Sequence, residues 1–238
     1  MNRLWKSLMG RGLVEPVDDF RSTNPATHPV LLNKLAEDFI EHGYDLRHTL
    51  KLIAMSATYA RSSITVDGNE TDDRFYSHMI QKPMEPAVLA DAISDVLGVA
   101  SQYGSEQYGT RAVELPDGSI RSDALDILGR CDRSKSCEGA PSPTGPLAQR
   151  LHLFNGGLLN DRVGAVGSRL DQFIKAEMRP MEIVEDYYQT ALNRPPNEQE
   201  VRFLSMLLNP AKSSKEQRNL LGDFVWSIAT CKEFVTNH

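Results

Sequence analysis

Hydrophobic residues recur every three or four positions along most of this chain, which is the pattern of amphipathic helices. Pro29 suits the first turn of a helix, and Gly43 is placed to end it. Asp45 can cap the next helix, and Pro86 can open a third. The apolar positions of these helices are Leu31, Leu32, Leu35, Ala36, Phe39 and Ile40, then Leu46, Leu50, Ile53, Ala54 and Ala57, then Leu89, Ile93, Val96 and Leu97. The pattern predicts a helical bundle over residues 1–98.

The same spacing returns in the C-terminal part, residues 145–238. A helix is expected after Pro180, and Asn197 and Glu200 have the spacing of a capping box at the start of the next one. The apolar positions here are Leu147, Leu151, Phe154 and Leu158, then Ile183, Val184, Tyr187, Tyr188, Ala191 and Leu192, then Phe203, Leu204, Leu207 and Leu208, then Leu220, Leu221, Phe224, Val225 and Ile228. This part is predicted to form a second sub-bundle.

Residues 99–144 are rich in glycine and proline and show little helical periodicity. Within them, RAVEL and SIR flank PDG, a pattern that favours one short β-hairpin. Further along, residues 130–146 have the composition of a loop. We therefore predict a single mainly α domain over residues 1–238. It would be a multi-helix bundle with irregular loops, in which sub-bundles 1–98 and 145–238 are joined by the loop-rich middle.

Composition narrows the class of protein. The 238 residues are 40% hydrophobic and 24% charged, which is ordinary for a soluble globular protein. The net charge of -6 weighs against nonspecific binding to nucleic acid or to an anionic membrane surface. No apolar run reaches the roughly 20 residues of a membrane span, so no membrane insertion is expected. The N-terminus lacks the apolar stretch of a secretory signal, so a complete chain of this sequence is expected in the cytoplasm.

The stretch GRGLVEPVDDFR concentrates charge near the N-terminus. Glu15, Asp18 and Asp19 could surround a cation or a sugar hydroxyl. Arg11 and Arg21 could orient a carboxylate or sulfate beside them. Alternatively, the two arginines pair with the two aspartates and lock a structural corner. The spacing D-x-D-x-D-G of a regular metal loop is absent, which favours the corner.

His152 and Asn155 lie three residues apart in LHLFNGG and could face one pocket. A buried hydrogen-bonded bridge is the favoured interpretation, and a polar site shared with Asp18 and Asp19 is the alternative. The remaining histidines considered lack H-x-x-x-H spacing and are interpreted as surface or capping residues: His28, His42, His48 and His78. The sequence therefore predicts no metal site and no cofactor.

Cys131 and Cys137, in CDRSKSC, allow three interpretations. A disulfide that closes a small loop is favoured, two free thiols come second, and metal ligation comes last because only His152 lies nearby in the sequence. The flanking arginine and lysine side chains would lower a thiol pKa if they lie close, which keeps redox reactivity open. Covalent haem is excluded because no C-x-x-C-H occurs.

Six ordered blocks resemble the PSD-one family of planctomycete bacteria, also known as domain of unknown function fifteen-fifty-three. They begin with the N-terminal sixty residues and continue with GTRAVELPDGSI, LDILGRCDRSKSCE, LHLFNGGLLNDRV, ALNRPPNEQEV and CKEFVTNH. The resemblance implies no catalytic residues, because the family's activity is not established. It implies that such chains usually follow a second domain of unknown function, and often a c-type cytochrome domain, in long exported proteins. This chain would then be a truncated or stand-alone form, or a fragment of a periplasmic or exported protein.

Three functions follow as hypotheses. The leading one is a helical accessory or interaction domain that supports neighbouring domains of an exported, redox-associated protein and helps bind a partner or polymer. The second is an enzyme of undescribed type, such as a hydrolase acting on polysaccharides or their sulfated fragments. The third is a thiol redox module. The chain lacks the G-x-S-x-G, phosphate-loop and G-x-G-x-x-G motifs, so the sequence leaves open whether it is an enzyme.

Overall fold

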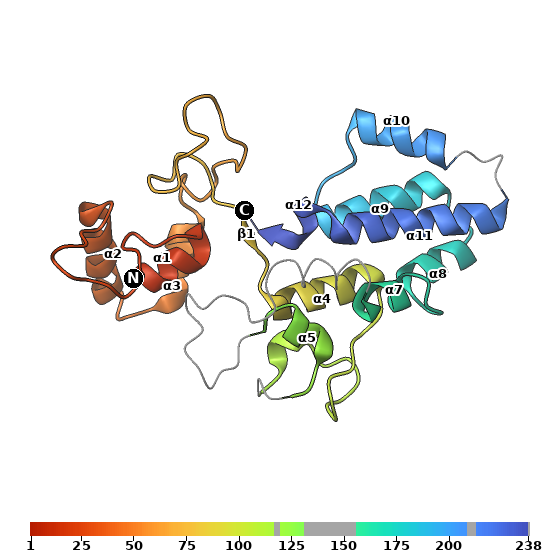
Figure 1. The fold of residues 1–238 in the computed structure, drawn as a ribbon, viewed down its shortest axis with the longest axis horizontal. Coiled ribbons are helices and arrows are strands. Elements are labelled where there is room, and N and C mark those ends of the chain that lie inside the picture. The colour runs from red at the N-terminus through yellow and green to blue at the C-terminus, as the bar shows by residue number, and fades with distance from the viewer. Residues whose placement is uncertain (117–119, 131–155, 209–212, 238) are drawn as a thin grey trace. The chain divides into compact units, whose positions relative to one another are not determined.

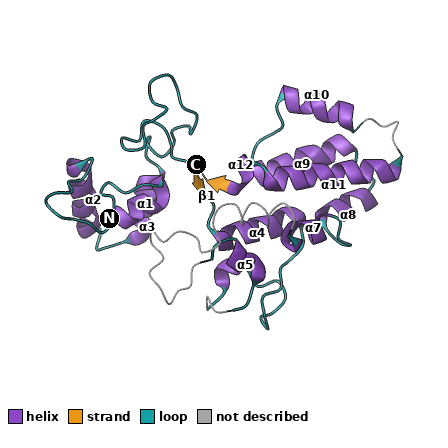
Figure 2. Ribbon diagram, viewed as in Figure 1, coloured by secondary structure: helices purple, strands orange, loops and turns teal. Residues whose placement is uncertain are grey.

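The structure, a computed structural model, describes residues 1–116, 120–130, 156–208 and 213–237 (Figure 1). The fold is mainly α with one two-stranded antiparallel sheet in the described residues, which confirms the predicted class (Figure 2). The chain divides into two compact units: Met1–Pro83 together with the C-terminal strand, and Met84–Val235. Across the described ranges, the structure has no helix with the length and apolar character needed to cross a membrane.

The N-terminal unit is built from three helices and the small sheet. Their bounds are α1 (Asn2–Met9), α2 (Pro29–Glu41), α3 (Leu46–Ala54), β1 (Lys82–Pro83) and β2 (Thr236–Asn237). Pro29 lies in the first turn of α2, and the Asp45 side chain caps α3 by accepting hydrogen bonds from the backbone N–H groups of Arg47 and His48, as predicted. The core of this unit consists of Trp5, Met9, Leu13, Leu35, Ile53, Tyr76 and Met79.

The second unit contains the remaining described helices. Their bounds are α4 (Pro86–Leu97), the 3-10 helix η1 (Ala112–Glu114), α5 (Asp123–Ile127), α7 (Gly157–Val163), α8 (Arg169–Lys175), α9 (Pro180–Leu192), α10 (Glu198–Leu207), α11 (Ser214–Thr230) and α12 (Lys232–Val235). The long helix α11 packs against α9 and α7, and α4 packs against α5, α7 and α9 (Figure 1). Helix α4, which the hydrophobic pattern grouped with the N-terminal helices, therefore shares its core with α9 and α11.

The sheet does not lie where the sequence placed a hairpin. Ala112–Glu114, within RAVEL, is a 3-10 turn. Its first N–H groups donate to the buried carboxylate of Asp91 on α4, at 2.7 Å from Ala112 and 3.1 Å from Val113. This anchoring favours a helical turn over a strand. The observed strands β1 and β2 pair segments that are far apart in the sequence. The helix expected around Leu147 and Leu151 lies outside the described residues.

The buried carboxylate of Asp171 ties α8 to its surroundings. It accepts a hydrogen bond from the backbone N–H of Gly167 at 2.9 Å and forms ion pairs with Lys175 at 2.7 Å and Arg218 at 3.2 Å. Together these interactions lower the pKa of Asp171 from its ordinary value of 3.8 to about 2, and the hydrogen bond from Gly167 has the largest effect. A lowered pKa in the folded state means that the charged form stabilises the fold.

We expect Asp171→Asn to lower Tm at pH 7 and to have little effect on Tm near pH 2. The stabilisation by the charged carboxylate is present above the unfolded pKa of 3.8 and is lost as the pH falls through about 2. Thermal melts of both proteins between pH 7 and pH 2 would measure the difference. The exposed Asp161 provides a control, because Asp161→Asn should leave Tm nearly unchanged throughout. A Tm difference for Asp171→Asn that is independent of pH would contradict this prediction.

Candidate metal centre

The loop that follows α1 is held by the buried side chain of Asn2. Its Nδ2 donates to the carbonyl oxygens of Val14 and Val17, both at 2.8 Å, and its Oδ1 accepts from the N–H of Val14 at 3.1 Å. A Cβ on Gly12 would lie 2.5 Å from the Val14 carbonyl oxygen, so this position requires glycine. The stretch GRGLVEPVDDFR is therefore held in place mainly by the side-chain amide of Asn2, a role that was not predicted from the sequence.

The charged residues of this loop form separate pairs. Arg21 pairs with Asp19 at 2.6 Å, as the corner interpretation proposed. Asp18 pairs instead with Arg3 on α1, at 2.6 Å. Arg11 pairs with Asp73, at 3.0 Å, far along the chain. The expected pairing of Arg11 with this aspartate pair is therefore wrong, because partners from α1 and from the segment before β1 lie closer.

Glu15 is a half-buried carboxylate of the loop. It accepts hydrogen bonds from the Lys6 ammonium at 2.9 Å and from the Gly12 N–H at 3.0 Å. Burial by itself raises the pKa of Glu15, but these two donors outweigh burial and lower the pKa below its ordinary value. Arg11, Asp18, Asp19 and Arg21 thus do not converge on one point with Glu15. The other predicted site residues, His152, Asn155, Cys131 and Cys137, lie outside the described residues.

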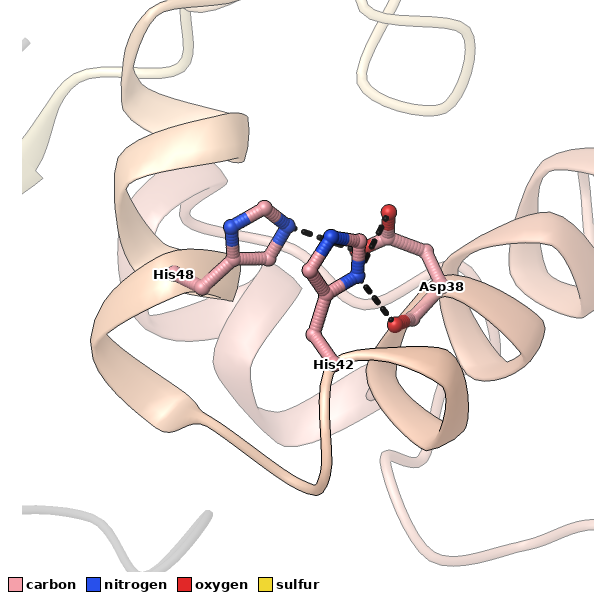
Figure 3. Close-up of side chains that lie close together, drawn as sticks. All are labelled: Asp38, His42 and His48. Atoms are coloured by element: carbon pink, nitrogen blue, oxygen red, sulfur yellow. Dashed lines mark hydrogen bonds and ion pairs between the residues drawn. The ribbon is translucent and has the colours of Figure 1, made fainter.

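The described residues bring three metal-binding side chains together at the corner between α2 and α3 (Figure 3). Asp38 and His42 come from the last turn of α2 and its cap, and His48 comes from the first turn of α3. One ligand atom from each lies within 4.8 Å of the others. The two imidazole rings are stacked, with centroids 3.8 Å apart and an angle of 14° between the planes. Both rings turn toward the Asp38 carboxylate.

Each histidine nitrogen lies near a different oxygen of the Asp38 carboxylate, at a distance typical of two ligand atoms that share a metal ion. Nε2 of His48 lies 3.1 Å from Oδ2 of Asp38, and Nδ1 of His42 lies 3.4 Å from Oδ1. Ligand atoms around a tetrahedral zinc ion with bonds of about 2.0 Å are roughly 3.3 Å apart. Nδ1 of His42 is also 2.9 Å from the Asp38 carbonyl oxygen. Either nitrogen of His42 can therefore serve as the ligand, Nδ1 directly or Nε2 while Nδ1–H donates to that carbonyl.

The local sequence explains why these side chains meet. Residues four apart on a helix share a face, so Asp38 and His42 project together. Gly43 and Tyr44 then both adopt left-handed backbone angles, each with φ of 64°, and reverse the chain within two residues. Asp45 starts α3 at once by capping it. The tight corner places His48 over His42. The carbonyl end of α2 also carries partial negative charge, which favours a cation there.

The donor set selects the kind of metal. Two imidazole nitrogens and one carboxylate oxygen suit zinc and other divalent first-row transition metals, whereas calcium and magnesium prefer oxygen ligands alone. The three side chains are between 29% and 45% exposed. Three protein ligands that are open to solvent leave coordination positions for water or for a group of another molecule.

The sequence carried part of this signal. The H-x-x-x-H pattern, which these residues lack, concerns histidines alone, whereas the spacing here is Asp38-x-x-x-His42 near the end of a predicted helix. His48 lies three residues after the predicted cap Asp45. Recognising the site from sequence would have required the geometry of the turn between the helices, which depends on the left-handed Tyr44 as well as on Gly43.

In a comparison with protein-family models, residues 1–208 match PSD1, described as a protein of unknown function (DUF1553). No curated protein and no solved structure shows significant similarity to the chain. The comparisons therefore assign no activity to the three side chains at the corner.

Proposed function

The chain belongs to the DUF1553 family, and from that starting point we propose that its N-terminal unit is a binding module for a divalent transition-metal ion. The observation that carries the proposal is the convergence of Asp38, His42 and His48 within 4.8 Å at one helical corner. A metal bound there would join the end of α2 to the start of α3 and would keep open positions toward solvent.

This role is compatible with an accessory domain of a longer protein. An exposed ion with free coordination positions can accept a ligand from a neighbouring domain or partner, so the site supplies a contact point without a catalytic cleft. The proposed partners are the domains that accompany this family in longer chains. Neither the cavity on α11 nor the cavity beside η1 is lined by Asp38, His42 or His48.

The same three groups could instead form only an ion pair between histidine and aspartate. Two features favour a metal. Both imidazoles face one carboxylate, although one would suffice for an ion pair, and each has a nitrogen 3.1–3.4 Å from a carboxylate oxygen, close to the separation expected of two ligand atoms on one ion. A metal also requires histidines without a proton on the ligand nitrogen, so acid weakens metal binding, whereas it strengthens an ion pair between histidine and aspartate.

Zinc binding to the full chain, after treatment with a chelator, tests the proposal. Isothermal titration at about pH 7.5 should detect one site that Asp38→Asn, His42→Ala or His48→Ala each weakens by more than about 100-fold, since even outer-shell changes cost 10–100-fold. His78→Ala serves as the control, because His78 belongs to the same unit but lies outside the cluster. Lowering the pH to about 5.5 should weaken binding to the unaltered protein.

Circular dichroism would show that each variant keeps its helices, so that a loss of affinity reports on the ligands. Asp38→Asn keeps the shape of the side chain and protects the test against misfolding. Zinc affinity that is the same in all three variants as in the unaltered chain would mean that zinc binds elsewhere. That result, or the absence of zinc binding, would overturn the proposal.

A further inference from the structure

A second feature lies in the other unit and is independent of the metal centre. A cavity of about 660 Å³ opens on the surface of α11 beside α7 and the start of α8. Its volume falls within the range of about 300–1,000 Å³ that is usual for small-molecule sites. Val163 and Leu170, both buried, form an apolar floor. Gly222 on α11 has no side chain to fill the cavity. A Cβ at this position would lie 3.8 Å from Val163, in ordinary van der Waals contact.

Polar and aromatic groups surround this floor. Asn219, Asp223 and Trp226 follow one another on α11 at intervals of four and three, so they share one face of the helix. Asn160 adds a second amide from α7, and Arg218 stands at the edge. The cavity thus combines an indole ring, two amides and a carboxylate over an apolar base.

The charges at the cavity restrict the ligand. The buried Asp171 carboxylate is shared between Lys175, at 2.7 Å, and Arg218, at 3.2 Å, so the Arg218 guanidinium keeps part of its positive charge. The exposed Asp223 has no ion-pair or hydrogen-bond partner in the described part of the chain. An anionic ligand would meet the uncompensated carboxylate of Asp223, and a cationic ligand would meet Arg218. A neutral ligand rich in hydroxyl groups avoids both the repulsion by the Asp223 carboxylate and the repulsion by the Arg218 guanidinium.

We propose that this cavity binds a neutral hexopyranose unit of an oligosaccharide. A pyranose ring has a face of C–H groups, which stacks on an indole, and an edge of hydroxyl groups, which need donors and acceptors. The carboxylate of Asp223 can accept from two neighbouring hydroxyls, and the amides of Asn219 and Asn160 can both donate and accept. Sulfated sugars are excluded from this proposal by the charge of Asp223.

Saturation-transfer NMR on the full chain tests the proposal with neutral pentasaccharides of β-1,4-, β-1,3- and α-1,4-linked glucose and of β-1,4-linked mannose. At least one should bind. Trp226→Ala and Asp223→Ala should each weaken that binding about tenfold or more, as expected for losing a stacking surface or a hydrogen bond to a charged group. Asn219 is exposed on α11, so Asn219→Ala is a third cavity variant, one that should keep the fold.

Phe203→Ala is the control, because Phe203 is an exposed aromatic residue of α10 in the same unit but not part of the cavity. Dextran sulfate and choline chloride serve as anionic and cationic probes. Binding of none of the four neutral pentasaccharides, binding of the charged probes alone, or affinities unchanged in all three cavity variants would each overturn the proposal. Because zinc binding involves the other unit, its failure would leave this result unaffected.

Discussion

Replacing Asn2 with alanine is expected to lower the free energy of unfolding of the N-terminal unit by about 3–4 kcal/mol, because it leaves three buried backbone groups without partners. Asn2 is only 3% exposed, and it satisfies both polar groups of Val14 and the carbonyl of Val17. Water cannot replace these hydrogen bonds without opening the loop. Urea unfolding followed by circular dichroism and tryptophan fluorescence would measure the loss, since Trp5 is buried in the same unit.

Two further variants sharpen this prediction. Asn2→Asp keeps the shape of the side chain but replaces the donor amide with an oxygen that faces two carbonyl groups, so it should destabilise at least as much as alanine. Ser7→Ala, on the same helix, removes only an exposed hydrogen bond to the Leu4 carbonyl and should change stability by less than about 0.5 kcal/mol. If Asn2→Ala were as mild as Ser7→Ala, the amide could not be the lock of the loop.

The second large effect is expected at Arg194, which joins three helices of the second unit. Its guanidinium donates to both oxygens of Glu200 on α10, at 2.9 and 3.0 Å, and to both oxygens of Glu233 on α12, at 2.7 and 2.9 Å. It also lies 5.2 Å from the ring centroid of Tyr188 on α9. Burial, together with the Glu200 carboxylate, raises the pKa of Tyr188 to about 12, so this ring stays neutral beside the cation.

Arg194→Ala should lower the free energy of unfolding by about 2 kcal/mol, because two carboxylates lose a bidentate partner in one change. Chemical denaturation of the full chain would measure it. Arg179→Ala is the matched control, since Arg179 is 81% exposed and its ion pair is with Glu182 on its own helix. Exposed pairs of this kind contribute about 0–1 kcal/mol. Equal losses in the two variants would contradict a joining role for Arg194.

Local signals in the sequence predicted the helices well. Pro29, Asp45 and Pro86 start helices in the structure, and Asn197 with Glu200 forms the expected capping box, with hydrogen bonds of 2.9 and 2.7 Å. These features depend on contacts within a few residues, which a single sequence displays directly. The mainly α class follows from them.

Contacts between distant segments could not be predicted in the same way. Asn2 meets a loop 12 and 15 residues later, Asp91 holds a turn more than 20 residues later, and Arg11 finds Asp73. Charges within GRGLVEPVDDFR suggested internal pairing because only nearby partners are visible in a sequence. The folded chain offers more partners, and the charges divide among them. For the metal centre, the helical spacing was visible, but the approach of His48 depends on the turn.

Zinc-edge anomalous diffraction from crystals of the zinc-loaded full chain tests the central claim most directly. The account predicts an anomalous peak at the corner of α2 and α3, about 2.0–2.2 Å from one nitrogen each of His42 and His48 and from a carboxylate oxygen of Asp38. A corner without a peak, in which the imidazoles remain hydrogen-bonded directly to the Asp38 carboxylate while zinc lies elsewhere, would contradict it.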